Sequence, residues 1–323
     1  VNILTSVDGK MDEHSQSYEF GSSYYQEGEF SSYIPIMNGC NNFCSYCIVP
    51  YVRGREVSRS VEDILQEMTF LSEKGVKEVT LLGQNVNSYT YEQEDGTIIN
   101  FPKLLTHLCA HKTNIKWIRF DSPHPKDFTD ELIEVIKNEP KIARHLHIPM
   151  QSGSTRILSL MNRKYSREQF KQLIEKLREA VEGITFATDV MVGFPSETEE
   201  EYQQTLNMLG LMRCLEAFMY YYNPREGTKA VSMEEQIGED EKSRRLSALI
   251  EYQHAIIAEE KTKRLGMDVE VLVTQVSKHD KSSMLGRTEH NEMVVFASDA
   301  PVGTILKVHL EKLAGNTYKG RLL

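Results

Sequence analysis

Six short apolar runs separated by longer amphipathic stretches constrain the fold of this chain most strongly. Strand–helix alternation with short connections implies right-handed βαβ units and a parallel sheet. Six such units are too few for a closed eight-stranded barrel, so we predict an α/β fold built on an open, partial (β/α)6 barrel. The predicted strands are 33–38, 77–82, 116–121, 145–150, 184–192 and 215–222. The helical patterns between them are 61–74, 101–111, 127–138, 155–162, 166–182 and 198–212.

The pattern changes after a long amphipathic helix predicted over 239–265. From there, apolar residues recur with period two at 269–273, 293–296 and 305–310, and glycines separate these runs. Such a pattern predicts a small antiparallel β-barrel of about sixty residues, the size of oligonucleotide-binding barrels. We therefore expect three parts: a polar linker over 1–29 that enters from something upstream, a core over 30–262 and the small barrel over 263–323.

Composition narrows the class of protein. The chain has 323 residues, of which 40% are hydrophobic and 26% charged, as in a soluble globular protein. It contains no run of about 18 apolar residues and no secretory signal, so we expect a cytoplasmic protein without a membrane span. The net charge of −10 argues against a generic nucleic-acid binder. The last 63 residues, however, hold 10 Lys and Arg against 7 Asp and Glu, which allows RNA contact there.

Three of the five cysteines lie close together, with the spacing Cys-x3-Cys-x2-Cys, at Cys40, Cys44 and Cys47. They follow the first predicted strand, at the end where parallel α/β folds place their chemistry. Three thiolates are one ligand short of a closed structural zinc site. A 4Fe-4S cluster held by three cysteines instead keeps one iron open for a small molecule. A zinc site completed by a distant His or Cys remains the alternative.

The other predicted strands also end in polar segments. Each segment alone is compatible with ordinary turn chemistry. Six polar strand ends at one mouth, one of them with three thiols, indicate an active site instead. These segments include Gly83-Gln84-Asn85, Asp121-Ser122-Pro123-His124-Pro125, Met150-Gln151-Ser152-Gly153, Asp189 with Gly193-Phe194-Pro195, and Tyr222-Asn223-Pro224.

Together these motifs resemble the methylthiotransferase family of radical S-adenosylmethionine enzymes, over essentially the whole chain from about residue 30. The run Leu-Gly-Gln-Asn-Val-Asn-Ser-Tyr at 82–89 resembles the tRNA-directed MiaB type, the 2-methylthio-N6-dimethylallyladenosine synthases. The segments 47–56 and 122–125 agree with that type. Gly-Arg-Thr-Glu-His-Asn at 286–291 resembles the TRAM domain, an RNA-binding module.

The resemblance implies an enzyme that methylthiolates carbon 2 of N6-isopentenyladenosine beside the anticodon of tRNA, by way of a 5′-deoxyadenosyl radical. Its cofactors would be a 4Fe-4S cluster on the three cysteines and S-adenosylmethionine, which would also supply the methyl group. Three alternatives stay open: another tRNA adenosine derivative, an aspartate of a ribosomal protein, or a zinc-bearing RNA-binding protein without catalysis. The family normally carries an N-terminal domain whose three further cysteines hold a second cluster. We expect the chain alone to lack that sulfur-carrying cluster.

Beyond the cluster ligands we predict no catalytic side chain, but several binding residues. For S-adenosylmethionine we expect Tyr46 at the adenine, Gln84, Asn85 and Ser122 at the methionine end, and Gln151, Asp189 and Asn223 at the ribose or adenine. For RNA we expect Arg53, Arg55, Lys278, Lys281, Arg287 and His290. Cys109 and Cys214 are expected to be buried residues rather than ligands. The expected partners are tRNA and an electron donor such as flavodoxin or ferredoxin, and the expected state is a monomer.

Overall fold

The core is built from two parallel half-sheets of three strands each. The computed structural model describes Phe20, residues 25–278 and residues 280–323, so most of the expected linker over 1–29 lies outside the described residues. The first half-sheet has the strand order β1-β4-β7 and the second has the order β10-β9-β8. The strands are β1 Ser31–Pro35, β4 Glu78–Leu82, β7 Trp117–Phe120, β8 His145–His147, β9 Thr185–Val192 and β10 Glu216–Tyr221.

The two half-sheets join between β7 and the segment that precedes β8. There an isolated parallel bridge pairs Ile118 with Ile142. The Ile118 N–H donates to the Lys141 carbonyl at 2.7 Å, and the Ala143 N–H donates to the Ile118 carbonyl at 3.1 Å. The far strands, β1 and β10, each have one neighbour in their half-sheet. They are edge strands on either side of a lateral opening, so the predicted open barrel of six strands is confirmed.

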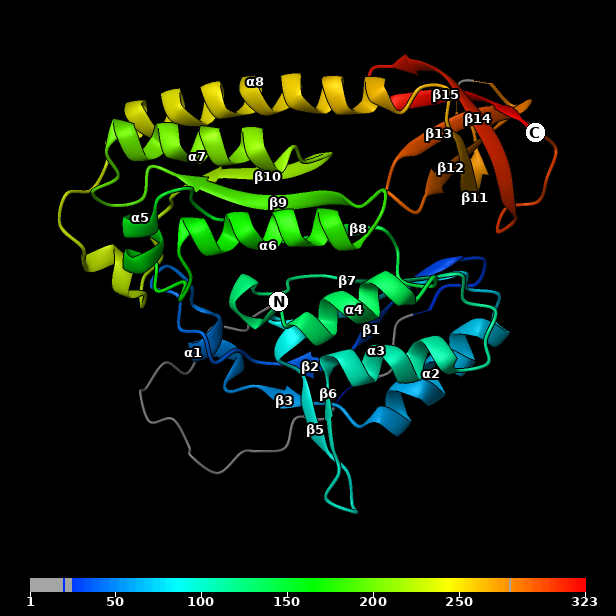
Figure 1. Cartoon of the computed structure of the whole chain (residues 1–323), viewed down its shortest axis with the longest axis horizontal. Coiled ribbons are helices and arrows are strands. Elements are labelled where there is room, and N and C mark those ends of the chain that lie inside the picture. The colour runs from blue at the N-terminus through cyan, green and yellow to red at the C-terminus, as the bar shows by residue number, and fades with distance from the viewer. Residues whose placement is uncertain (1–19, 21–24, 279) are drawn as a thin grey trace.

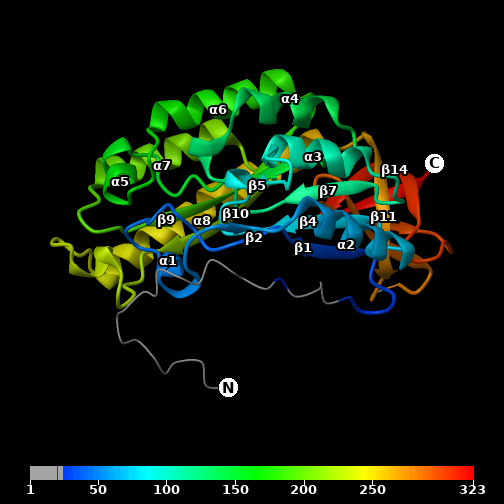
Figure 2. The same cartoon turned by 90° about the horizontal axis from the view of Figure 1, so that it is seen from below.

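Helices cover the outside of both half-sheets (Figure 1). Figure 2 shows α3, α4 and α6 as an outer arch over the strands. The predicted helices are confirmed within a few residues, because their caps are encoded locally. For example, the Ser60 hydroxyl accepts from the Asp63 N–H at 3.1 Å. The main helices are α2 Val61–Glu73, α3 Phe101–Ala110, α4 Asp130–Asn138, α5 Thr155–Leu160, α6 Arg167–Ala180, α7 Glu199–Met212 and α8 Glu239–Lys263.

Short elements complete the core. They frame the cysteine loop and the strand ends. They are β2 Met37–Asn38, α1 Val49–Arg53, β3 Val57–Ser58, β5 Thr90–Glu92, β6 Ile98–Asn100 and three 3-10 turns at Val86–Ser88, Pro125–Asp127 and Lys229–Ser232.

The two faces of the half-sheets differ in polarity. Side chains alternate along a strand, so one set faces the helices and the other faces the barrel interior. Ile34 and Leu81, which face the helices, are fully buried in the main apolar core. Their neighbours Tyr33, Thr80 and Arg119 lie in register across β1, β4 and β7 and line the interior. The interior is therefore polar, unlike the packed apolar centre of a closed barrel.

The C-terminal region forms the small closed barrel that the sequence predicts. Its strand order is β11-β12-β13-β15-β14. Four of the five pairings are antiparallel, and the β13–β15 pair is parallel. The period-two runs lie in β11, β13 and β14, whereas β12 and β15 were not predicted. The bounds are β11 Asp268–Val276, β12 Ser283–Thr288, β13 Met293–Ala297, β14 Ile305–Ala314 and β15 Thr317–Leu322.

The turn after β12 docks the small barrel on both half-sheets. On the first half-sheet, Arg119 of β7 donates to the Glu289 carbonyl at 2.7 Å. On the second, the Asn291 side chain donates to Glu216 of β10 at 3.0 Å. Trp117 of β7 is buried against Leu272 of β11 in an apolar cluster at the same interface. The barrel therefore touches both halves of the core, at the strand ends opposite the cysteine loop (Figure 1).

No helix in the described part of the chain is both long and apolar enough to cross a lipid bilayer.

Candidate functional site

The cysteine loop begins at a glycine that no other residue replaces easily. Gly39 has a φ of +81°, and a Cβ there would lie 2.0 Å from the Arg55 carbonyl oxygen. The Gly39 N–H donates to the Gln84 side-chain oxygen at 2.7 Å. The next residue, Cys40, donates its N–H to the Gly54 carbonyl at 3.2 Å. The start of the loop is therefore held between the end of β4 and the segment after α1.

The middle of the loop is held by the segment that follows α5. The Asn162 side chain donates to the carbonyls of Asn42 and Phe43, at 3.1 and 2.8 Å. The Ser45 N–H donates to the Met161 carbonyl at 3.0 Å, and its hydroxyl donates to the Leu160 carbonyl at 2.8 Å. These four bonds fix the loop backbone on both sides of its second cysteine, Cys44. Sequence reasoning did not single out this segment.

Arg163 continues the same segment and brings a buried positive charge to the thiols. Its guanidinium lies 3.6 Å from the Cys44 sulfur. Another of its N–H groups donates to the Pro149 carbonyl at 3.2 Å, and the group lies over the Tyr165 ring. None of the ion pairs found among the described residues gives Arg163 a carboxylate partner, although its exposed fraction is 7%. A buried guanidinium beside a thiol stabilises negative charge on sulfur.

The three thiols differ in exposure. Cys40 is buried, and burial raises the pKa of its thiol to about 11. Cys44 and Cys47 are half-buried, and burial also raises the pKa of Cys47. Since metals bind thiolates, a positive centre must replace these protons. No three Cys, His, Asp or Glu side chains among the described residues converge on one ion. A four-iron cluster does not require this, because each thiolate binds a different iron.

Tyr46 belongs to a separate apolar cluster beside the cysteine loop. It packs, partly buried, with Ile157, Phe194 and Tyr222. Asn223, which directly follows that cluster at the end of β10, is exposed. Two of the residues that we predict for the adenine or ribose thus adjoin one apolar cluster, Tyr46 by packing against it and Asn223 by following Tyr222 in the chain.

The residues predicted for the methionine end have different partners. Gln84 holds the cysteine loop through Gly39, as described above. Asn85 is buried and donates to Asp127 at 3.0 Å, while its own side-chain oxygen has no hydrogen-bond partner among the described residues. Ser122 is half-buried with a φ of +59° and lines the interior cavity. The buried, unpartnered oxygen of Asn85 fits an amino group better than it fits a carboxylate.

Gln151 and Asp189 meet at the carboxyl end of the second half-sheet. The Gln151 N–H donates to the Asp189 carbonyl at 2.8 Å, and the Met191 N–H donates back to the Gln151 carbonyl at 2.8 Å. Gln151 has a φ of +65°. Its side chain is buried, whereas the Asp189 carboxylate points into the interior. The backbones of these two predicted residues are therefore adjacent, but the Gln151 side chain is buried whereas the Asp189 side chain lines the cavity.

The interior holds a cavity of about 430 Å³ between the two half-sheets. Its titratable lining residues include Asp121, which directly follows β7, and His147 of β8. Burial raises the pKa of Asp121. Burial opposes charge on His147 as well, but Asp189, 3.4 Å away, outweighs it and raises the pKa of His147. The full lining is Tyr33, Thr80, Arg119, Phe120, Asp121, Ser122, His145, His147, Ala187, Asp189, Glu216, Phe218, Tyr220, Arg287 and Asn291.

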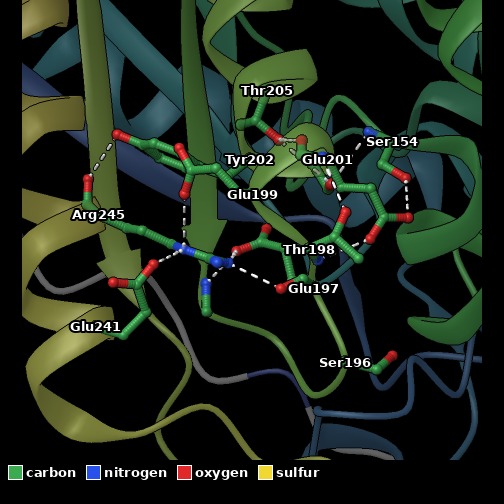
Figure 3. A network of polar contacts seen from close by, with 12 residues as sticks. Ser154, Ser196, Glu197, Thr198, Glu199, Glu201, Tyr202, Thr205, Glu241 and Arg245 are labelled. Carbon is green, nitrogen blue, oxygen red and sulfur yellow. Dashed lines mark hydrogen bonds and ion pairs between the residues drawn. The ribbon is translucent and has the colours of Figure 1, made fainter.

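The segment Gly193-Phe194-Pro195 after β9 has a structural role. Glu197 is buried and accepts from the Gly193 N–H at 2.6 Å and from Arg245 at 2.8 Å (Figure 3). Thr198 and Glu201 form a reciprocal cap at the start of α7. This network fixes α8 to the loop, which agrees with the turn chemistry that the sequence allows there.

The residues predicted for RNA divide into two groups. Arg53, Arg55, Lys278 and Lys281 are exposed. Arg287 instead pairs with the buried Glu78 and donates to Ser31 at 2.8 Å. His290 is buried, with its Nδ1 3.0 Å from the Thr185 hydroxyl and 3.1 Å from the Arg144 carbonyl. Arg287 and His290 thus have partners in the domain interface, whereas the first group lies on the exposed surface.

Comparison with known proteins shows the family of this chain. The radical SAM superfamily model matches residues 34–209, and the TRAM domain model matches residues 262–323. The tRNA-2-methylthio-N(6)-dimethylallyladenosine synthase of Treponema denticola is 47% identical over 311 residues, which is 94% of this chain and 69% of that protein. The chain belongs to the radical SAM family that includes this synthase. The Bacteroides fragilis protein of the same name is 44% identical over 292 residues, 90% of this chain and 64% of that protein.

A solved structure agrees at the level of fold. The radical S-adenosylmethionine methyltransferase TsrM from Kitasatospora setae, with cobalamin and a [4Fe-4S] cluster bound, has a TM-score of 0.51 and 17% identity. It covers 62% of this chain, and this chain covers 38% of TsrM. The cofactors of the family are a 4Fe-4S cluster and S-adenosylmethionine. The donor set here fits the cluster, because three thiols share one loop beside a buried cation.

Proposed function

We propose that this chain carries the core that methylthiolates carbon 2 of N6-isopentenyladenosine in tRNA. The observation that supports it most is the three-cysteine loop, held on one side by Gln84 and on the other by Asn162. Both belong to strand ends or loops at the mouth of the partial barrel. A small barrel of the RNA-binding type is attached to the same core, which supports RNA as the substrate.

In this proposal Cys40, Cys44 and Cys47 hold the cluster, which when bound supplies the electron that cleaves S-adenosylmethionine. Gln84 and Asn162 position the loop, and Arg163 balances the negative charge of the thiolates. Tyr46, Asn85, Ser122, Gln151, Asp189 and Asn223 bind S-adenosylmethionine. Arg53, Arg55, Lys278 and Lys281 contact RNA phosphate, an interaction that weakens as salt increases.

The proposal extends to the organisation and partners of the chain. We assign residues 30–262 to the core and 263–323 to the RNA-binding barrel. Only five cysteines are present, and Cys109 and Cys214 are buried in separate places. The chain alone therefore has no second cysteine cluster to deliver sulfur. We propose a cytoplasmic monomer that takes electrons from a flavodoxin or ferredoxin.

The test is anaerobic reconstitution with iron and sulfide, followed by reduction in the presence of S-adenosylmethionine. We expect about four irons per chain and release of 5′-deoxyadenosine, but no methylthiolated tRNA from this chain alone. The Cys44→Ala variant is the matched control, and we expect it to lose both iron and cleavage. One zinc per chain without iron would contradict the radical chemistry. Methylthiolated tRNA from the chain alone would contradict the assignment of sulfur delivery elsewhere.

A further inference from the structure

Three exposed aromatic side chains line the lateral opening of the partial barrel. They are Tyr33 on β1 and Phe218 and Tyr220 on β10, with exposed fractions of 59%, 42% and 49%. We call them the aromatic rim. All three line the interior cavity, and they come from the two edge strands on opposite sides of the opening. Exposed apolar side chains gathered at a cavity mouth mark a binding surface rather than a packing accident.

The floor below the aromatic rim is polar and charged. The Nε2 atom of His147 lies 3.4 Å from a carboxylate oxygen of Asp189, and the Nε2 atom of His145 lies 3.9 Å from one of Glu216. Phe218 lies directly against His147, with 5.5 Å between the ring centroids. Asp189 and Glu216 also line the cavity, so their carboxylates can accept hydrogen bonds from a ligand that enters it. The cavity thus offers flat aromatic surfaces above polar and charged groups.

A nucleobase matches that combination. Sequence-specific RNA recognition uses single-stranded loops, whose unstacked bases stack on aromatic side chains and hydrogen-bond through their edges. The small barrel does not supply such surfaces from its Phe or Tyr side chains. Phe296 is 2% exposed, and Tyr318 is fully buried with its hydroxyl on Glu292 at 3.0 Å. Within the part of the chain that the structure describes, exposed Phe or Tyr rings for an RNA loop therefore come from the core.

We propose that Tyr33, Phe218 and Tyr220 form a stacking platform for unstacked bases of the RNA loop that enters the lateral opening. This inference rests on the proposed function, because it names the part of the protein that holds the loop. Base–aromatic stacking tolerates different bases, since every base has a flat face. The platform therefore adds affinity for single strands over duplex, and the polar floor below it contacts the base edges.

The test measures binding of an anticodon stem-loop RNA that carries 2-aminopurine in its loop, at fixed salt. We expect Tyr33→Ala, Phe218→Ala and Tyr220→Ala each to weaken binding by roughly 5- to 100-fold. Binding of the wild-type chain should quench the 2-aminopurine fluorescence by stacking, and the variants should quench it less. Binding of a fully paired RNA duplex, which presents no unstacked base, should be equally weak in all chains.

Three further variants separate stacking from general effects. Phe70→Ala removes an aromatic of similar exposure, 45%, from α2 on the outer surface, and we expect unchanged binding. Phe218→Leu keeps an apolar side chain but removes the ring, whereas Phe218→Trp keeps a ring. Stacking predicts loss with Leu and retention with Trp. Fluorescence of Trp117, the single natural tryptophan, checks folding in all variants except Phe218→Trp, where circular dichroism replaces it.

The outcomes distinguish the two proposals. If the wild-type chain binds the stem-loop and the three alanine variants bind it equally well, the platform is wrong and the proposed function stands. If the wild-type chain does not bind the stem-loop at all, RNA as the occupant fails together with the proposed substrate. Retained binding in Phe218→Leu would show that the rim contributes apolar contact only, which also contradicts stacking.

Discussion

Glu78 holds the small barrel to the core, and its removal gives the sharpest prediction from the interface. Its carboxylate is 1% exposed and accepts from Arg119 at 2.8 Å, from Ser31 at 2.8 Å and from Arg287 of the small barrel. Glu78→Ala leaves two guanidinium groups without this partner in the interface. Breaking a buried pair by removing one partner costs about 3–5 kcal/mol. Because the Arg287 side chain is 28% exposed and can reach water, we expect about 3 kcal/mol.

The assay is urea denaturation, with the fluorescence of Trp117 as the readout of unfolding. This residue reports on the interface directly, because it is buried against Leu272 and Ile305 of the small barrel. The matched control is Glu270→Ala, which removes an exposed ion pair with Lys116 across the same interface, at 2.7 Å. An exposed pair contributes about 0–1 kcal/mol. If Glu78→Ala and Glu270→Ala shift the transition equally, burial of the Glu78 network does not stabilise the interface.

Three other predictions concern the thiols and the interface histidine. Arg163→Met removes the cation beside Cys44 and should move the midpoint potential of the cluster to a more negative value. The control Lys164→Met removes a neighbouring exposed charge and should leave the potential unchanged. Equal potentials for the two variants in a redox titration would refute the role of Arg163. Burial raises the pKa of the Cys109 and Cys214 thiols, which disfavours the thiolates that metals bind. The double variant Cys109→Ala and Cys214→Ala should therefore bind as much iron as the wild type. Loss of iron without unfolding would show that one of the two is a ligand. Burial lowers the pKa of His290 to about 2, so below pH 6.5 the unfolded chain binds a proton that the folded chain does not. The free energy of unfolding should therefore fall as the pH falls below 6.5, by up to about 1.4 kcal/mol per pH unit. His290→Gln should flatten this pH dependence in urea denaturation, and an unchanged slope would show that His290 does not contribute to it.

The sequence predicts the core well because its information is local. Each core strand is an apolar run between helices whose caps are encoded within a few residues, as at Ser60 and Thr198. The strand β12 was missed because Ser-Met-Leu-Gly-Arg-Thr has no period-two apolar pattern. Its glycine is required by tertiary packing, since a Cβ at Gly286 would lie 2.4 Å from a Val271 methyl carbon.

The candidate site is only partly predictable, because several of its contacts join distant segments. Arg163 is 119 residues from Cys44 in the sequence. Asn162 and Arg163 are two polar residues after a short helix, and nothing in the local sequence predicts their contacts with the cysteine loop. Arg287 and His290 were predicted as RNA contacts because they are basic residues of the small barrel. Their partners Glu78 and Thr185 lie in the core, so their place in the domain interface follows from docking and not from local sequence.

The docking of the small barrel also has a mechanical consequence for the opening. Among the described residues, strands of the two half-sheets pair only between β7 and the segment before β8, so a small rotation there would change the gap between β1 and β10 most. The end of β12 and the turn after it bond to β4 and β7 through Arg287 and Glu289, and to β9 and β10 through His290 and Asn291. We therefore expect the docked barrel, together with the bonds of Ser45 to Met161 and Ala230, to resist changes in the distance between Tyr33 and Phe218.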